Sequence, residues 1–377
     1  MKLATTMLVS FVLALLAFGM VVLYSASVTR YGGHYMVVQT AAAGIGLLLC
    51  AVVASQDYRH LKKISWLLFA AAAVLLVLVF VPGIGMKING ARRWINLRVT
   101  NFQPSEFAKI ALVIALAHYA ERNQRQLHSF TKAILLPSIL IGVILGLIFL
   151  GKDYGTTILL ATVSVLLLLI AGVRWRFLVP SGLILVVGLA AAIWSNEMRR
   201  SRVLAWLNPE QQKDGINYQV DQAVIALGSG GLYGLGLGNG RQKLGFVPEN
   251  HTDFILSIIG EELGLVATLG VLASFALVVV CGVYIARRAR DTFGMLLAAG
   301  MTFLIGLQAA INIGVVTGAL PNKGLPLPFI SYGGSNLLMM LISVGLLISV
   351  ARKAVEHSVE ATETSDSSDV VASQMAR

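Results

Sequence analysis

The chain has 377 residues, of which 57% are apolar and only 12% are charged. Soluble domains carry roughly 25% charged residues, and the mean hydropathy of this chain is +0.80. These values exclude an ordinary soluble domain. The net charge of +11 would suggest nucleic acid as a partner of a soluble protein, but Lys and Arg of a membrane protein are explained first by topology. We therefore expect a membrane protein with no nucleic-acid partner.

Apolar runs bounded by charges, Gly and Pro predict about ten membrane-spanning helices, since a bilayer needs about 20 apolar residues for each. The first run follows Lys2 and is too long for a cleaved signal sequence, so it is expected to be retained. The predicted fold is all-α and polytopic, with residues 1–355 forming one membrane domain. The predicted spans are 5–28, 34–54, 64–82, 104–120, 132–150, 155–173, 177–195, 252–286, 293–319 and 329–351.

The distribution of basic residues predicts the orientation of these spans. With the N-terminus inside, every inner connection is basic, whereas the short outer connections carry only Arg30, Lys152 and Lys323. The positive-inside rule therefore places both the N- and C-termini in the cytoplasm. The inner cations are Arg59, Lys62, Lys63, Arg122, Arg125, Lys132, Arg174, Arg176, Arg287, Arg288, Arg290, Arg352 and Lys353.

Two long outer segments break this pattern. Segment 83–103 and the large extracytoplasmic loop 196–251, between the seventh and eighth spans, both carry several cations. A long loop can cross the membrane despite its charge, so these cations form either a solvated surface or a site for an anion at the outer face. In the first loop, Arg92 and Arg93 are the candidates for such a site.

A second candidate lies in FQPSEFAK, at the start of the fourth span. Glu106 and Lys109 are three residues apart, which puts both side chains on one face of a helix. Charged groups inside a span are costly and often functional. They form either a structural ion pair or, with Arg92 and Arg93, part of a cationic pocket at the outer end of that helix.

The third candidate is PENHTDFILSIIGEELG, at the start of the eighth span. Asp253 is expected in the first helical turn, where the helix dipole favours its ionised form. It acts either as a cap or as a general base facing the outer cations. Glu261 and Glu262 follow about two turns deeper, roughly 12 Å along the axis, and are interpreted as structural.

Three further segments have specific expectations. The glycine-rich Gly228–Leu244 run contains neither common phosphate-binding motif and predicts either a loop whose backbone allows close approach or simply a series of turns. The proline-rich Leu320–Ser335 run predicts a rigid or re-entrant turn over a cavity, with Lys323 pointing to the outer face. Asp153 begins the sixth span and is expected to cap it or to form an ion pair.

Other regions are expected to carry no chemistry. Cys50 and Cys281 lie inside apolar spans and are interpreted as packing residues. The histidines lack the spacing of metal ligands, so no metal site is predicted; no cofactor is indicated, and nothing in the sequence calls for a divalent cation. The acidic, Ser- and Thr-rich tail 356–377 predicts a disordered cytoplasmic end.

The order of these motifs resembles the SEDS family of bacterial cell-wall proteins (shape, elongation, division and sporulation). The resemblance covers the chain from the first span to about residue 353, and GLGLGNGRQKL and LPNKG are closer to the division branch than to the elongation branch. The motifs that carry it are GARRW, FQPSEFAK, DYGTT, IALGSGG, PENHTDFI, IGEELG and PLPFISYGGS.

The resemblance implies a peptidoglycan glycosyltransferase that polymerises lipid II at the outer face of the bacterial cytoplasmic membrane, during septal wall synthesis. It implies a class B penicillin-binding protein, a transpeptidase, and other divisome proteins as partners. The catalytic aspartate of the family falls on Asp253. The other functional positions fall on Arg93, Glu106, Lys109 and Lys323, and the neighbouring Arg92 is added as a candidate for substrate binding.

Three positions depart from the family pattern. Gly245 stands where division-type members commonly have Glu, so any catalytic role of that Glu has no counterpart here. Lys152 replaces a proline in PDxGT, so the form of the local turn does not carry over. The change of PTKG to PNKG is mild and retains Lys323.

Two other functions fit a polytopic chain with buried charges. A lipid II flippase, or another transporter, would place ionisable groups near the bilayer midplane, whereas the best candidates here gather at one face. A membrane scaffold that recruits the transpeptidase would use its charges only for assembly.

Overall fold

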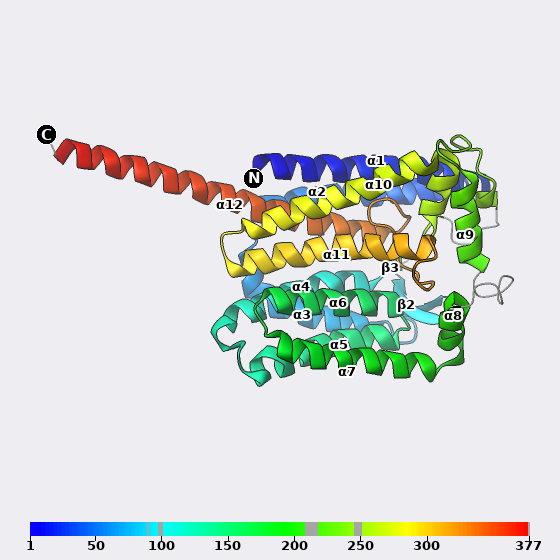
Figure 1. The fold of residues 1–377 in the computed structure, drawn as a ribbon, viewed down its shortest axis with the longest axis horizontal. Helices are drawn as coiled ribbons and strands as arrows, with labels where there is room; N and C mark the ends of the chain where they lie inside the picture. Colours follow the sequence, from blue (N-terminus) through cyan, green and yellow to red (C-terminus); the bar gives the residue numbers. More distant parts are fainter. Residues whose placement is uncertain (89, 97–100, 208–217, 245–250, 376–377) are drawn as a thin grey trace.

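The computed structural model describes residues 1–377 except 89, 97–100, 208–217, 245–250 and 376–377. Within that part, long helices run side by side along one axis (Figure 1), and each predicted span overlaps one of them. They are α1 (Lys2–Tyr31), α2 (His34–Ser55), α3 (His60–Leu78), α4 (Pro104–Arg122), α5 (Leu136–Leu150, after a π-helical turn Thr131–Leu135), α6 (Tyr154–Ile170), α7 (Trp175–Trp194), α10 (Ile255–Arg287), α11 (Thr292–Val316) and α12 (Gly334–Met375).

The two ends of the bundle differ. At one end, called here the sheet end, lie an antiparallel sheet in the order β1-β2-β3 and two short helices (Figure 1). At the other, the termini end, the chain begins and α12 leaves the bundle, continuing as a helix to Met375 (Figure 1); disorder of 356–377 stays a prediction. The sheet-end elements are β1 (Gly85–Ile88), β2 (Ala91–Asn96), β3 (Asn101–Phe102), α8 (Glu197–Leu207) and α9 (Tyr218–Ser229).

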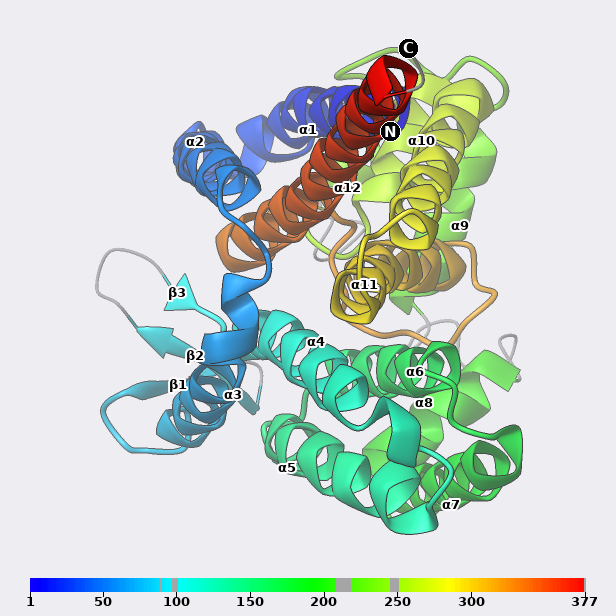
Figure 2. The same ribbon diagram turned by 90° about the vertical axis from the view of Figure 1, so that its left-hand side faces the viewer.

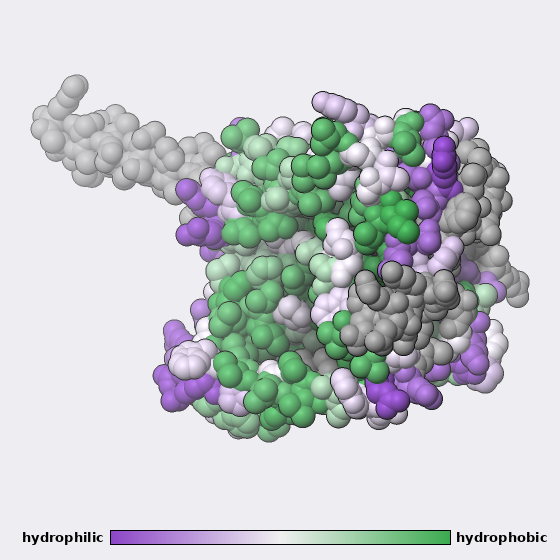
Figure 3. All heavy atoms as spheres, turned by 45° about the vertical axis from the view of Figure 1, so that its right-hand side comes forward, coloured by the Kyte–Doolittle hydropathy of each residue, from purple (hydrophilic) through white to green (hydrophobic). Residues whose placement is uncertain are grey.

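The surface is that of a membrane protein. Figure 3 shows a broad apolar belt between more hydrophilic ends. In the described residues, 7 helices are long and apolar enough to cross a bilayer, and α6 and Trp175–Gly188 of α7 are shorter apolar helices. The remaining predicted span, the fourth (104–120), coincides with α4, which carries buried charges.

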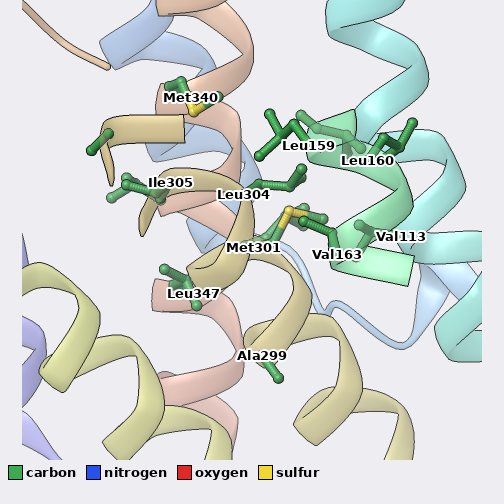
Figure 4. Close-up of a cluster of buried hydrophobic side chains, with 14 of the residues drawn as sticks. Val113, Leu159, Leu160, Val163, Ala299, Met301, Leu304, Ile305, Met340 and Leu347 are labelled. Carbon is green, nitrogen blue, oxygen red and sulfur yellow. The ribbon is translucent and has the colours of Figure 1, made fainter. Parts of the chain in front are cut away.

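The core lies where α4 and α6 meet α11 and α12. Figure 2 shows α3 to α8 on one side and α1, α2 and α9 to α12 on the other, and Figure 4 shows the apolar side chains between them, among them Val113, Leu159 and Met301. Small residues allow close packing, as in other membrane proteins: a Cβ on Gly300 would lie 2.4 Å from a Val113 methyl group. Cys50 and Cys281 are buried and free, which confirms their interpretation as packing residues.

Helix α10 is broken at Gly264, whose φ of 76° and ψ of −171° are not helical. A break exposes backbone groups that lipid cannot satisfy, and the glycine-rich loop supplies their partners. Four backbone hydrogen bonds of 2.9 to 3.2 Å join them: Leu265 N–H to Gly231 O, Val266 N–H to Leu232 O, Leu235 N–H to Glu261 O and Gly236 N–H to Glu262 O. The close backbone approach predicted for this loop is confirmed.

The carboxylates of Glu261 and Glu262 hold the same loop. Glu262 forms a buried ion pair with Lys243, with 2.6 Å between Nζ and Oε1, and accepts a hydrogen bond from Ser25 of α1 at 2.6 Å. Glu261 accepts from the backbone N–H of Arg241 at 2.8 Å. The interpretation of both residues as structural is confirmed.

Asp291 joins α2, α3 and α11 at the termini end. Its carboxylate accepts hydrogen bonds from the Tyr58 hydroxyl at 2.7 Å, the Gly294 N–H at 2.9 Å and the Lys62 ammonium at 3.0 Å. Burial raises the pKa of this carboxyl, but the hydrogen bonds outweigh burial, so the pKa lies below its usual value. The stability that a depressed pKa contributes is present above the unfolded pKa of about 4 and is lost as the pH falls through the folded value.

We expect Asp291→Asn to lower the free energy of unfolding by about 1 kcal/mol at pH 7, because hydrogen bonds to a charged acceptor are lost. The difference from wild type should shrink as the pH falls below about 4. Thermal unfolding of the two detergent-solubilised proteins between pH 7 and pH 3 measures this, and a difference that does not change with pH would contradict the assignment.

Two glycines of the loop give a matched test of its packing against α10. Both have positive φ, 80° at Gly234 and 87° at Gly238. A Cβ on Gly234 would lie 2.2 Å from the Glu262 carbonyl oxygen, whereas a Cβ on Gly238 would have no neighbouring atom within 4 Å. Gly238→Ala should cost about 1 kcal/mol from backbone strain. Gly234→Ala adds overpacking of about 1–3 kcal/mol, so its melting temperature should be clearly the lower of the two; equal values would contradict this packing.

Candidate functional site

A pocket of about 250 Å³ opens at the sheet end and is lined by cations from four elements. Arg93 comes from β2, Lys152 from the turn between α5 and α6, Arg202 from α8, and Lys323 from the proline-rich segment before α12. Tyr154 and Asn322 also line it. These six residues are called the cationic pocket below, and its position confirms that the proline-rich run borders a cavity.

The two predicted arginines are adjacent in β2, where the register with β1 is irregular, and they have different partners. Arg93 donates a hydrogen bond to the Lys152 carbonyl oxygen and lies 3.8 Å from the Asp153 carboxylate. Arg92 instead donates to the Phe80 carbonyl oxygen at 3.0 Å and is not among the residues that line the cationic pocket. Of the pair, only Arg93 faces this site.

Asp153 has both of the roles expected of it. Its carboxylate accepts from the Thr156 N–H at 3.3 Å and so caps α6, while Arg93 is its ion-pair partner. Ser105 and Gln103 donate to its second oxygen, each at 3.2 Å. The start of α6 is thereby tied to β2 and to the start of α4.

Glu106 and Lys109 pair as their spacing predicts, with 2.7 Å between Nζ and Oε2. Their side chains are only 2% and 1% exposed, and neither is among the residues that line the cationic pocket. The ion pair therefore does not line the cationic pocket, and a pocket shared with Arg92 and Arg93 stays a prediction. The ion pair lies in the core between α4 and α11, where Lys109 donates to the Gln308 side chain at 2.7 Å.

Two amides of α11 connect this ion pair to the sheet end. Gln308 donates to the Pro326 carbonyl oxygen at 2.8 Å and to Asn336 at 2.9 Å. Asn312, one turn further along the helix, donates to the main-chain oxygens of Asp253 and Leu325, both at 2.7 Å. The sequence analysis missed both amides, although two polar residues four apart in an apolar span share a helix face and are expensive in lipid.

Asp253 lies in a turn before α10, whose N-cap is Phe254, and not in the first helical turn as expected. Its carboxylate packs against the proline-rich segment, because a Cβ on Gly324 would lie 2.8 Å from Oδ2. Gly324 directly follows Lys323, so Asp253 sits beside the cationic pocket. Its half-buried side chain combines partial shielding with access from the sheet end.

Stacked rings hold the residue two positions before Asp253. His251 stacks on Tyr35 of α2 with 4.8 Å between ring centroids, and Tyr35 contacts Tyr332 at 4.5 Å. The main chain of His251 also accepts from the Tyr332 N–H at 2.9 Å. Both sides of Asp253 are thus fixed, while Gly245 lies outside the described residues, and no cluster of three metal-ligating side chains occurs in the part that is described.

Exchanging one atom of Asn312 tests the amide connection. Asn312→Asp replaces a donor to two buried carbonyl oxygens with an acceptor, so it should displace Asp253 and lower the rate of the reaction by at least tenfold, as about 1–3 kcal/mol per unsatisfied group implies. Asn336→Asp introduces the same group but keeps the acceptor that Gln308 uses, so it should be much milder. The activity assay described below measures both, and equal losses would contradict the connection.

The comparisons with known proteins agree on one family. Residues 5–356 match the model of cell cycle proteins named for FtsW, RodA and SpoVE. A protein of Trichlorobacter lovleyi named "Probable peptidoglycan glycosyltransferase FtsW" is 40% identical over 346 residues, covering 90% of this chain and 91% of that protein. Stage V sporulation protein E of Bacillus subtilis is 37% identical over 355 residues, covering 92% and 96%.

Solved structures show the same fold. One from a study of how a peptidoglycan synthase complex coordinates polymerization and crosslinking has a TM-score of 0.78 and 32% identity, covering 92% of this chain and 97% of its own. The rod shape determining protein RodA of Thermus thermophilus has a TM-score of 0.70 and 30% identity, covering 92% and 96%. The chain belongs to the FtsW, RodA and SpoVE family of polytopic membrane proteins, the SEDS family, and is similar to members named FtsW.

Proposed function

We propose that this chain is an inverting peptidoglycan glycosyltransferase that polymerises lipid II during septal wall synthesis. The observation that carries the proposal is the position of Asp253, a carboxylate beside a pocket lined by four cations. Relatives that carry the name "Probable peptidoglycan glycosyltransferase FtsW" and that match 90% of this chain support it. The sheet end then faces outward from the bacterial cytoplasmic membrane, and the basic connections and both termini lie in the cytoplasm.

The chemistry needs a base on one side and cations on the other. Asp253 takes the proton from the 4-hydroxyl of the acceptor sugar, whose oxygen forms a bond to the anomeric carbon of the donor. The bond from that carbon to the lipid pyrophosphate breaks in the same step, so the configuration inverts. Arg93 and Lys323 stabilise the negative charge that develops on the pyrophosphate, as preorganised cations do in a partly shielded site.

The lipid chain needs an apolar site next to the pocket. A cavity of about 630 Å³ lies between α5, α6 and α7, and its lining is mainly apolar, with Ile141, Leu145 and Phe149 on α5. One end of each of these helices borders the cationic pocket. Lys152 follows α5, Tyr154 begins α6, and Ile193 lies near the end of α7, and all three residues line the pocket. We assign the polyprenyl chain to this cavity.

The other predicted substrate residues act at a distance in this proposal. Glu106 and Lys109 are too deeply buried to touch a sugar, so they position Asp253 through Gln308 and Asn312. Arg92 anchors β2 to the end of α3 through the Phe80 carbonyl oxygen and thereby fixes its neighbour Arg93. No step of the mechanism uses a metal ion or a cofactor.

A class B penicillin-binding protein, acting as transpeptidase, is the proposed partner, together with other divisome proteins. A relative studied in a complex that couples polymerization to crosslinking supports this. The flippase and scaffold alternatives predict no polymer. The cations at the sheet end favour catalysis at one face over transport through the midplane.

The experiment reconstitutes the purified chain with its transpeptidase, supplies lipid II and measures glycan polymer. Asp253→Asn should lower the rate at least a hundredfold, the lower range for loss of a general base. Glu197→Gln is the matched control, since Glu197 is an exposed carboxylate at the start of α8 on the same end, and it should retain the wild-type rate.

Each alternative has its own result. Wild-type polymer yield from correctly folded Asp253→Asn would remove the base assignment. Movement of lipid II between leaflets without polymer would favour the flippase, and neither movement nor polymer, with the transpeptidase still bound, would favour the scaffold.

A further inference from the structure

Two of the four cations in the pocket have no partner among the described residues. Within the described ranges, no hydrogen bond or ion pair holds the Lys152 ammonium or the Arg202 guanidinium, although both residues line the cavity. Two other lysines near the ends of the bundle are paired, Lys62 with Glu121 and Lys243 with Glu262. The pocket therefore presents charge that the described part of the chain does not neutralise.

The two cations approach from different walls. Lys152 lies on the turn between α5 and α6, and Arg202 lies on α8. Together with Arg93 and Lys323 they repel one another across one cavity, and an anion bound there converts this repulsion into attraction. The cavity of about 250 Å³ has room for a compact dianion such as a pyrophosphate group.

The backbone at Lys152 shows that this side chain is kept at a cost. Its φ is 65°, a conformation that is unfavourable for any residue with a Cβ and that the proline ring forbids. Strained positions of this kind concentrate at functional sites, and here the strained residue places both an ammonium in the pocket and a carbonyl oxygen on Arg93.

We propose that Lys152, opposite Arg202, is a substrate-binding residue that holds the pyrophosphate linkage of the lipid-linked donor. The assignment rests on the proposed function, and it adds a binding cation to Arg93 and Lys323, which were assigned there. A lysine ammonium supplies a point charge and an arginine a planar fork, and phosphate groups are bound by both. The consequence is that the chain should bind the lipid-linked donor more tightly, and be inhibited more strongly by free pyrophosphate, than a variant without this cation.

Four variants separate binding from structure. Lys152→Gln removes the charge, Lys152→Arg keeps it, and Lys152→Gly removes the side chain while relieving the strain at φ 65°. Lys87→Gln is the matched control, because Lys87 lies exposed on β1 at the same end but does not line the pocket, so net charge and long-range attraction change equally.

In the polymerisation assay, Lys152→Gln and Lys152→Gly should raise KM for lipid II about tenfold, the effect of one charge-assisted hydrogen bond, with little change in kcat. The inhibition constant of inorganic pyrophosphate should rise in parallel. Lys152→Arg and Lys87→Gln should stay within about twofold of wild type. Lys152→Gly should melt no lower than wild type, which a purely structural lysine would not allow.

Binding of inorganic pyrophosphate to the purified full chain, measured by calorimetry, tests the proposal independently of turnover. Weaker binding by Lys152→Gln with unchanged binding by Lys87→Gln supports it even if the wild type forms no polymer, in which case only the proposed function fails. Unchanged KM and unchanged pyrophosphate binding in Lys152→Gln would overturn it. So would a loss shared equally by Lys87→Gln.

Discussion

The hydrogen bonds of Gln308 and Asn312 are the constraint on which the site depends. In a membrane, helices gain little from burying apolar surface against one another, so polar contacts and close packing decide how they are placed. On one face of α11, Gln308 accepts a hydrogen bond from the buried Lys109 ammonium. One turn further, Asn312 donates hydrogen bonds to the Asp253 and Leu325 carbonyl oxygens. The same helix thus fixes α4, the start of α10 and the proline-rich segment relative to one another.

Hydrogen bonds also hold the glycine-rich loop against α10 at the sheet end. The break of α10 at Gly264 would leave backbone groups without partners in lipid. The glycine-rich loop pairs them, while Glu261 and Glu262 hold the C-terminal end of this loop. Asp253, the catalytic candidate, lies in the turn that precedes the short helical segment ending at this break. Flexible connections are therefore held by backbone hydrogen bonds at one side of Asp253 and by α11 at the other.

The sequence predicted the spans well because a bilayer imposes their length and polarity. It also predicted that the basic connections lie together at one end of the bundle, because topology follows charge. It predicted the pairing of Glu106 with Lys109 because their spacing is local. It did not predict how deeply that pair is buried, because burial depends on which helix packs opposite. Arg92 and Arg93 were treated alike because a short polar loop has no clear signal for the strand β2 or for the different partners of its two arginines.

The charges that violate the positive-inside rule are explained by this geometry. Cations on connections that are expected to leave the cytoplasm oppose insertion, and a strained backbone at Lys152 adds to the cost. Arg93 has a carboxylate partner, whereas Lys152 and Arg202 converge on a cavity without one. Charge without a partner among the described residues, beside a half-buried carboxylate at the end of an apolar bundle, supports the proposal that this site holds an anion. The negative charge of a pyrophosphate leaving group grows during the proposed reaction, and preorganised cations stabilise such an anion.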